Sequence, residues 1–321
     1  MMSDIRENRM TASESDQSIP SKRSKHTQRL GFIGLGKMGR PMTENLLKAG
    51  FEVTIHNRSQ TVVQELARQG ATAAGTPDDV AAGSDLVLTC LPTPASVEEV
   101  YFGEHGLLGA AREGMTLVDC STVGPELSRR IYAAAKERGA GFLDAPISGG
   151  PAGAQAASLT VMAGGDPETM ERARPVFEVL GENIYHVGAS GAGSVVKLVN
   201  QLLVAIHTAA AAEAVVFGVK AGADAGTLLD VLSTSYASSR MLTRCLPLII
   251  DRQFSGGTPV ELILKDLGLI QAVGAGQGTR LLLGSNAEVA FREALALGLG
   301  QEDMAALVKP VERVAGLTVR Q

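Results

Sequence analysis

Residues 30–39 read LGFIGLGKMG, and this stretch decides the fold of the chain. An apolar run is followed at once by glycines in the spacing GxGxxG, and a helical pattern opens behind them over 38–49. Gly34 permits a tight turn, Gly36 lets a phosphate approach the backbone because it has no Cβ, and Gly39 lets helix and strand pack closely. The free N–H groups at the start of such a helix face a phosphate. The stretch therefore predicts a dinucleotide-binding turn, with an ordinary flexible turn as the alternative; its ligands would be Gly34, Leu35, Gly36, Lys37, Met38 and Gly39.

Outward from this turn, short apolar runs alternate with helical patterns, which is typical of a doubly wound parallel sheet. The expected strands are 30–33, 52–55, 86–89, 116–119, 141–144, 159–163 and 183–186. The expected helices between them are 38–49, 61–69, 95–101, 125–137 and 167–180. We therefore expect an α/β Rossmann-type domain over residues 29–191 that binds NAD(P).

After Gly193 the pattern changes, because residues 194–320 contain no convincing strand. Helical patterns occupy 195–221, 225–233, 241–251, 259–274, 281–298 and 304–314. We expect an all-helical substrate and oligomerisation domain over residues 192–321. One such domain cannot bury every face of its long apolar helices, so a homodimer or a homotetramer is expected, and the sequence does not distinguish the two.

The most apolar stretch of the chain, residues 195–219, is long enough to span a membrane. Polar side chains interrupt it, however, and this favours a helix buried inside a soluble protein. The interrupting residues are Lys197, Asn200, Gln201, His207 and Glu213.

Composition excludes several other classes of protein. The 321 residues carry a net charge of −5 and 4 % aromatic residues, so neither a basic surface nor stacking platforms for nucleic acid are expected. Three widely spaced cysteines predict neither disulfides nor a zinc site, and no other metal site is expected. They fit a reducing cytoplasm. Polar and charged residues dominate residues 1–28 and predict a disordered tail, which lacks the apolar core of a secretory signal.

The second expected strand is followed by Asn57-Arg58-Ser59, where an NAD-binding chain would place an acid for the ribose 2′-hydroxyl. A neutral amide at Asn57 removes repulsion against a 2′-phosphate, and the Arg58 guanidinium attracts one. We therefore favour NADP over NAD and assign Asn57, Arg58 and Ser59 to the cofactor. The alternative is that Arg58 only stacks on adenine and that both cofactors bind.

Four longer stretches resemble the β-hydroxyacid dehydrogenase family, which includes 3-hydroxyisobutyrate dehydrogenase, tartronate semialdehyde reductase and 2-(hydroxymethyl)glutarate dehydrogenase. They are GFIGLGKMGRPM (31–42), DAPISGGPAGAQAASLTVMAGG (144–165), GAGSVVKLVNQ (191–201) and LKDLGL (264–269). The resemblance implies an oxidoreductase that transfers a hydride between NAD(P) and a small β-hydroxyacid or the matching semialdehyde. It also implies a C-terminal domain like that of 6-phosphogluconate dehydrogenase. It does not single out one member or one substrate.

The same resemblance implies the substrate and nicotinamide residues. From the residues alone, Ser148-Gly149-Gly150 is equally a turn between sheet elements or a loop that lets an anion approach the backbone. The resemblance implies the second: Ser148, Gly149 and Gly150 bind the substrate carboxylate. It also implies that Ser121 completes the substrate pocket, and that Leu91, Pro92 and Thr122 line the nicotinamide side of the groove.

Lys197 and Asn200 lie three residues apart and so share one face of the long helix. Taken alone, Lys197 is better explained as a lysine that extends from a buried helix to solvent than as a catalytic residue. The resemblance implies that Lys197 is the general acid or base, that Asn200 positions substrate or lysine, and that Lys265 closes the groove near the cofactor. Gln201 stands where the family more often has Asn, which blurs the substrate prediction.

Two other functions remain as alternatives. Imine reductases share this architecture but generally lack the lysine, so Lys197 and the intact SGG loop count against that function. A non-catalytic NAD(P)-binding interaction module is the second alternative, and the presence of Lys197 disfavours it as well.

Overall fold

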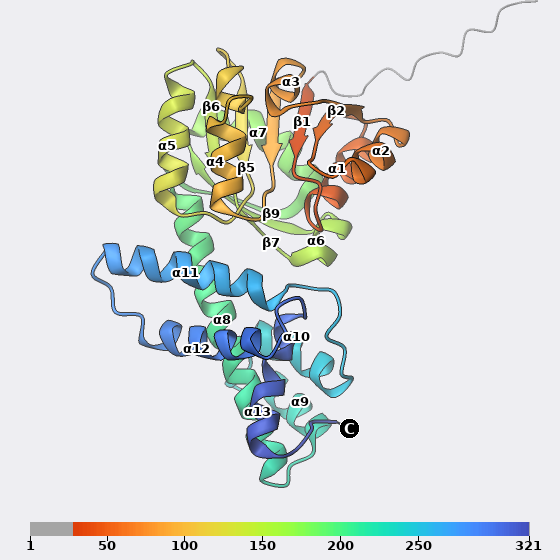
Figure 1. Cartoon of the computed structure of the whole chain (residues 1–321), viewed down its shortest axis with the longest axis vertical. Coiled ribbons are helices and arrows are strands. Elements are labelled where there is room, and N and C mark those ends of the chain that lie inside the picture. The colour runs from red at the N-terminus through yellow and green to blue at the C-terminus, as the bar shows by residue number, and fades with distance from the viewer. Residues whose placement is uncertain (1–27, 321) are drawn as a thin grey trace, which may run out of the picture.

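The computed structural model describes residues 28–320, which form a sheet part followed by a helical part (Figure 1). The last strand of the sheet ends at Gly188, and the first helix of the second part begins at Ala192. The disordered tail predicted for residues 1–28 lies outside the described residues, apart from Gln28. The predicted fold class, a Rossmann-type α/β domain followed by an all-α region, is confirmed.

The described residues form a nine-stranded sheet in the order β3-β2-β1-β4-β5-β6-β8-β7, with β9 paired to β8. The strands are β1 (Arg29–Ile33), β2 (Glu52–His56), β3 (Thr72–Ala73), β4 (Leu86–Thr89), β5 (Thr116–Asp119), β6 (Gly141–Asp144), β7 (Ile147–Ser148), β8 (Leu159–Gly165) and β9 (Gly181–Gly188). Every pair from β3 to β6 is parallel. The chain order reverses beside β1, so a ligand crevice is expected at the carboxyl ends of β1 and β4.

Helices cover both faces of the sheet, and each face has its own apolar core. On one face lie α1 (Gly39–Ala49), α2 (Gln60–Arg68) and α7 (Pro167–Leu180). On the other lie α3 (Pro77–Ala82), α4 (Pro94–Phe102), the 3₁₀ turn η1 (Leu107–Gly109) and α5 (Pro125–Lys136). The central strands β4 and β5 are buried at every position, as parallel strands covered on both faces must be.

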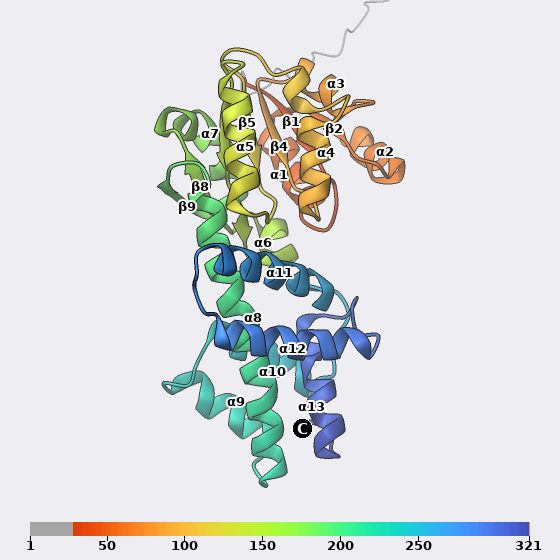
Figure 2. The same ribbon diagram turned by 60° about the vertical axis from the view of Figure 1, so that its left-hand side comes forward.

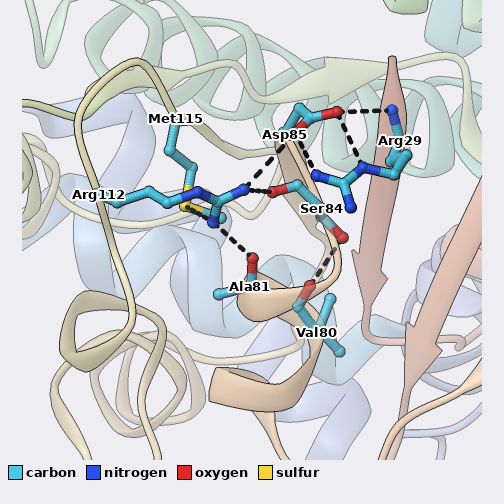
Figure 3. Close-up of polar contacts among 7 residues, drawn as sticks. All are labelled: Arg29, Val80, Ala81, Ser84, Asp85, Arg112 and Met115. Atoms are coloured by element: carbon cyan, nitrogen blue, oxygen red, sulfur yellow. Dashed lines mark hydrogen bonds and ion pairs between the residues drawn. The ribbon is translucent and has the colours of Figure 1, made fainter. Parts of the chain in front are cut away.

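A cluster of charged side chains closes the end of the sheet opposite the crevice (Figure 3). Arg29, the first residue of β1, donates from its backbone N, Nε and Nη2 to Asp85 at 3.1, 3.3 and 2.8 Å. Arg112 donates to the carbonyl oxygens of Ala81 and Ser84, behind α3, at 3.0 and 2.7 Å. These contacts fix the amino ends of β1 and β4, whereas the expected ligand crevice lies at the opposite ends of the two strands.

The helical part is built around α8 (Ala192–Lys220), which leaves the sheet part and runs down through the other helices (Figure 2). The others are α9 (Ala225–Thr234), α10 (Arg240–Ile250), α11 (Val260–Gly276), α12 (Leu282–Ala296), the 3₁₀ turn η2 (Met304–Leu307) and α13 (Val308–Ala315). Because α8 contacts α9 to α13 and also β8, it is the common support of both parts.

Two features of the sheet differ from the sequence prediction. β8 runs antiparallel to β6, with Asp144 opposite Gly164, so the sheet is not parallel throughout. The two-residue strands β3 and β7 and the short helices α3 and α6 (Gly150–Ala156) were not predicted. Elements of two to seven residues show too few repeats for a hydrophobic period to be recognised.

The apolar helix α8 is only partly buried. By length and composition it could cross a membrane, but 39 % of its most apolar window is buried inside the protein. Ala205 and Val215 are fully covered, whereas Val199 and Phe217 are 54 % and 76 % exposed. The helix is therefore buried on some faces only, and one apolar face of α8 has no cover within the described residues.

Candidate active site

The glycine turn has the geometry that its spacing predicts. Gly34 has a φ of +96°, and a Cβ there would lie 2.3 Å from the carbonyl oxygen of Cys90. A Cβ on Gly39 would lie 1.8 Å from the Gly34 oxygen. Both positions therefore require glycine for the β1 turn to pack against α1 and the β4 end. Gly36 differs, since nothing lies within 4 Å of the position of its missing Cβ.

The open space above Gly36 fits a pyrophosphate. The backbone N–H groups of Gly36, Lys37 and Met38 have no hydrogen-bond acceptor within residues 28–320. They sit at the amino end of α1, where a helix favours negative charge. An anion at this point would meet unpaired donors and no obstructing side chain, so the residues present fit the dinucleotide.

The end of β2 is tied to the same turn. Asn57 Oδ1 accepts a hydrogen bond from the Leu35 N–H at 3.0 Å, while its Nδ2 donates to the Ser59 carbonyl at 3.3 Å. Arg58 is exposed, and its guanidinium has no partner among the described residues. The side chain of Leu35 lies in the core, and its N–H donates to Asn57. Leu35 is therefore the one predicted cofactor residue that does not line the cleft between the sheet part and the helical part.

Ser121 holds the loop after β4. Its Oγ donates to Asp119 Oδ1 at 2.6 Å and accepts from the Leu91 N–H at 2.9 Å. Thr89 Oγ1 donates to the same carboxylate oxygen at 2.7 Å, and burial raises the pKa of Asp119. Because the Ser121 proton is used by Asp119, Ser121 keeps only a lone pair for a substrate and cannot donate to a carboxylate.

The segment Ser148–Gly150 presents a set of unpaired donors. Gly149 and Gly150 have φ values of +135° and +63°, and a residue with a side chain would be strained in either conformation. The Ser148 hydroxyl and the N–H groups of both glycines have no partner within the described residues. Three donors at successive residues form a suitable site for a small carboxylate.

Lys197 lies in the second turn of α8 and is 7 % exposed. Its Nζ donates to the Ile147 carbonyl at 2.8 Å, one residue before Ser148. Burial lowers the pKa of Lys197 from 10.5 to about 8, with the nearby Asp266 carboxylate opposing that shift. A buried amine with such a pKa can exchange a proton near neutral pH.

Asp144, at the end of β6, joins the sheet to the start of α8. Its Oδ1 accepts from the Gly191 N–H at 2.7 Å and its Oδ2 from the Ser194 N–H at 2.8 Å. Burial raises the pKa of Asp144 to about 6, although both backbone donors oppose the shift. A Cβ on Gly193 would lie 2.2 Å from the Asp144 carbonyl oxygen. The contact thus fixes where α8, and with it Lys197, begins.

Lys265 connects the helical part to the sheet part. Its Nζ donates to the Thr122 carbonyl at 3.0 Å and forms an ion pair with Asp266 at 2.9 Å. Asp266 is buried and also accepts a hydrogen bond from Gln201 Nε2. Both residues come from α11, so this helix closes one wall of the cleft.

All the other predicted residues meet in one cleft of about 2140 Å³ between the two parts. The glycine turn and the β2 end form its cofactor side, and Ser148–Gly150, Lys197 and Asn200 form its inner side. Sequence reasoning missed Asp119 and Asp144, which support the site from behind the cleft, and Asp266, which lines it. The first two could have been noticed, because each ends a central strand at the carboxyl edge of the sheet.

Two family models match consecutive parts of the chain. The model described as the NAD binding domain of 6-phosphogluconate dehydrogenase matches residues 29–188. The one described as NAD-binding of NADP-dependent 3-hydroxyisobutyrate dehydrogenase matches residues 191–311.

Solved structures of imine reductases, such as that from Myxococcus stipitatus at 20 % identity and a TM-score of 0.59, share the fold alone.

Individual relatives match almost their whole length. The chain is 39 % identical to the NAD-dependent L-serine dehydrogenase of Pseudomonas aeruginosa, covering 90 % of this chain and 99 % of that one. It is 40 % identical to the 2-(hydroxymethyl)glutarate dehydrogenase of Eubacterium barkeri, over 91 % and 97 %. The 3-hydroxyisobutyrate dehydrogenase of Mycobacterium tuberculosis, solved with L-serine, superposes with a TM-score of 0.82 at 34 % identity, over 88 % and 99 %. The chain belongs to the β-hydroxyacid dehydrogenase family.

Proposed function

We propose that this protein is an NAD(P)-dependent dehydrogenase that oxidises the alcohol of a small β-hydroxyacid to the semialdehyde, and catalyses the reverse reduction. One observation carries the proposal. The buried Lys197 amine donates to the Ile147 carbonyl, next to the free donors of Ser148–Gly150, and all of these groups share one cleft with the glycine turn. The relatives named above are dehydrogenases of acids of this kind. When bound, the nicotinamide cofactor supplies the hydride acceptor or donor.

The cofactor would be held by two sets of groups. The unpaired N–H groups of Gly36, Lys37 and Met38 would bind its pyrophosphate. The exposed Arg58, beside the neutral Asn57, would bind a 2′-phosphate, and this supports NADP as the preferred cofactor with NAD as the second. Leu91, Pro92 and Thr122 would line the nicotinamide side, with Lys265 holding the Thr122 carbonyl.

The substrate would be held at its carboxylate. Ser148 Oγ and the N–H groups of Gly149 and Gly150 donate to the carboxylate oxygens, and this places the β-carbon toward Lys197. Asn200, three residues along α8, faces the same part of the cleft. Among residues 28–320, no Phe or Tyr side chain lines the cleft, and this suits a small, polar acid.

Lys197 would move the proton. In oxidation, its neutral amine takes the hydroxyl proton of the substrate as the hydride leaves the carbon that bears this hydroxyl. In reduction, the ammonium gives that proton to the carbonyl oxygen and stabilises the alkoxide that develops. The Ile147 carbonyl, 2.8 Å from Nζ, holds the amine at this point of the cleft.

The test is turnover of a panel of C3–C5 hydroxyacids with NAD and with NADP, for the wild type and Lys197→Ala. We expect Lys197→Ala to lose about 10²–10⁴ in kcat while binding cofactor normally. The matched control is Lys48→Ala, which removes an exposed lysine outside the cleft. Turnover of Lys197→Ala within about tenfold of wild type would contradict the proposed role of the lysine.

We also propose that the protein works in the cytoplasm as a homodimer or homotetramer. The three cysteines are all free, which suits a reducing compartment. The uncovered apolar face of α8 and exposed apolar residues of α12 support self-association. Sedimentation or light scattering of the purified protein tests the oligomeric state, and a monomer at micromolar concentration would contradict it.

A further inference from the structure

Gln201 connects Asn200 to a buried carboxylate. Its Nε2 donates to Asp266 Oδ2 at 2.5 Å, and its Oε1 accepts from Asn200 Nδ2 at 2.8 Å. Gln201 is 7 % exposed and Asp266 is 1 % exposed, so water does not compete readily for either hydrogen bond. The three side chains form a continuous chain of hydrogen bonds from α11 to the face of α8 that carries Lys197.

The charge of Asp266 sets the direction of this chain. Asp266 forms an ion pair with Lys265 at 2.9 Å, and an ionised carboxylate has acceptors only. Gln201 must therefore turn its amino group to Asp266 and its oxygen to Asn200. Asn200 must in turn present its amino group to Gln201, since an oxygen there would face another oxygen.

We propose that Asp266 and Gln201 are positioning residues that fix the amide of Asn200, so that its Oδ1 faces the substrate side of the cleft as a hydrogen-bond acceptor. Asn200 lines the cleft, and its Oδ1 has no donor within the described residues. An acceptor at this place repels a carboxylate, which is bound at Ser148–Gly150 instead. While Lys197 is an ammonium, which can only donate, Asn200 Oδ1 receives the O–H of the substrate, and this proton turns to Nζ when the amine is neutral. In this respect the inference rests on the proposed function.

The direction of the amide can be measured without turnover. Neutron diffraction from crystals of the deuterated full chain separates an ND₂ group from an oxygen, which X-ray data at ordinary resolution do not. We expect the Asn200 deuterons to point at Gln201 and those of Gln201 to point at Asp266. An Asn200 amide turned the other way, with its amino group in the cleft, overturns the proposal whatever the enzyme oxidises.

The consequence for binding is tested with two acids of similar size, 3-hydroxypropionate and 3-fluoropropionate, because fluorine cannot donate a hydrogen bond. Their dissociation constants are measured by calorimetry on wild type and Gln201→Met in the presence of the reduced cofactor, with which the hydroxyl probe cannot react. Methionine keeps the volume of glutamine but frees the Asn200 amide to rotate. We expect the preference for the hydroxyl probe to fall about fivefold in Gln201→Met.

Thr208→Val is the matched control, since it removes a buried hydrogen bond of α8 that lies outside the chain from Asn200 to Asp266. It should leave the hydroxyl preference at the wild-type value. An unchanged preference in Gln201→Met, with the variant folded by circular dichroism, refutes the positioning role. Failure of the wild type to bind either probe counts against the proposed substrate class, and the neutron experiment then decides the direction of the amide by itself.

Discussion

Lys197 shows how the position of a residue in the fold changes its chemistry. Burial lowers the pKa of Lys197 to about 8, so about one-tenth of the amine is neutral at pH 7. Asp266 and Lys265 act on it in opposite directions, the carboxylate favouring the ammonium and the second lysine disfavouring it. The residue type was visible in the sequence, but this balance depends on groups that the fold brings from α11.

The lowered pKa of Lys197 predicts opposite pH dependences for the two directions of the reaction. Oxidation needs the neutral amine, so kcat/KM should rise through about pH 8 and then level off. Reduction needs the ammonium, so its kcat/KM should fall through the same range. Lys265→Met removes a neighbouring positive charge and should move both midpoints to higher pH. Parallel profiles in the two directions would show that Lys197 is not the group that titrates.

Arg58 allows a prediction about the cofactor. Its guanidinium is exposed and unpaired within the described residues, beside an uncharged Asn57. Arg58→Ala should raise the KM for NADP about tenfold and leave the KM for NAD nearly unchanged. Steady-state kinetics with each cofactor measure both values. Arg68→Ala, at an exposed position outside the cleft, is the control; equal losses for both cofactors in Arg58→Ala would show that Arg58 does not recognise the 2′-phosphate.

Among the elements, the contact of β6 with α8 matters most for the site. Asp144 accepts two backbone N–H groups at the start of α8, in the manner of a helix cap supplied from another strand. The same segment then runs through Ile147, which holds Lys197, to the donors of Ser148–Gly150. One loop therefore positions the Lys197 amine and the proposed carboxylate site relative to each other.

Asp144→Asn should disturb this junction. An amide can accept from Gly191 or from Ser194, but it turns its own amino group toward the other N–H, and one donor loses its partner. We expect the free energy of unfolding to fall by about 2 kcal/mol in urea titrations, and kcat to fall with it. Asp230→Asn, at an exposed position of α9, is the control. Wild-type stability of Asp144→Asn would show that the capping contact is energetically unimportant.

Most elements could be predicted from the sequence because periodicity is local. The long strands and helices fall within a few residues of their expected bounds, and the GxGxxG turn has the expected geometry. The antiparallel pairing of β8 with β6 could not be predicted, because the short elements β7 and α6, which lie between the two strands and reverse the chain, give no recognisable period. The hydrogen bond of Gln201 to Asp266 spans 65 residues, so the direction of the Asn200 amide also required the structure.

On the scale of the whole molecule, the single chain leaves apolar surface uncovered. Val196, Val199 and Leu203 on α8 are 40 %, 54 % and 47 % exposed, and Leu282 and Val289 on α12 are 55 % and 64 % exposed. Exposed apolar side chains in such number are typical of protein interfaces. The cleft opens beside this apolar surface, because Leu203 belongs to both.

Charges placed on α12 should test the association. Leu282 and Val289 are seven residues apart and so lie on one side of the helix. The double variant Leu282→Glu and Val289→Glu should dissociate the oligomer into monomers, as measured by light scattering, without loss of helical circular dichroism. Gln69→Glu, on the sheet part, adds charge away from this surface and should leave the assembly intact. An unchanged mass for the double variant would place the interface elsewhere.

Because α8 is attached to the sheet part at Asp144, a small rotation about this point would move the far end of the helix much further than its start. The helix has 29 residues, so it is about 43 Å long, and α9 to α13 are carried on it. A rotation of about 5° at its base would displace the far end by about 4 Å but Lys197 by less than about 1 Å, because Lys197 is only five residues from the start. Large movements of the outer surface, and of any neighbour bound to it, therefore leave the reacting groups nearly still.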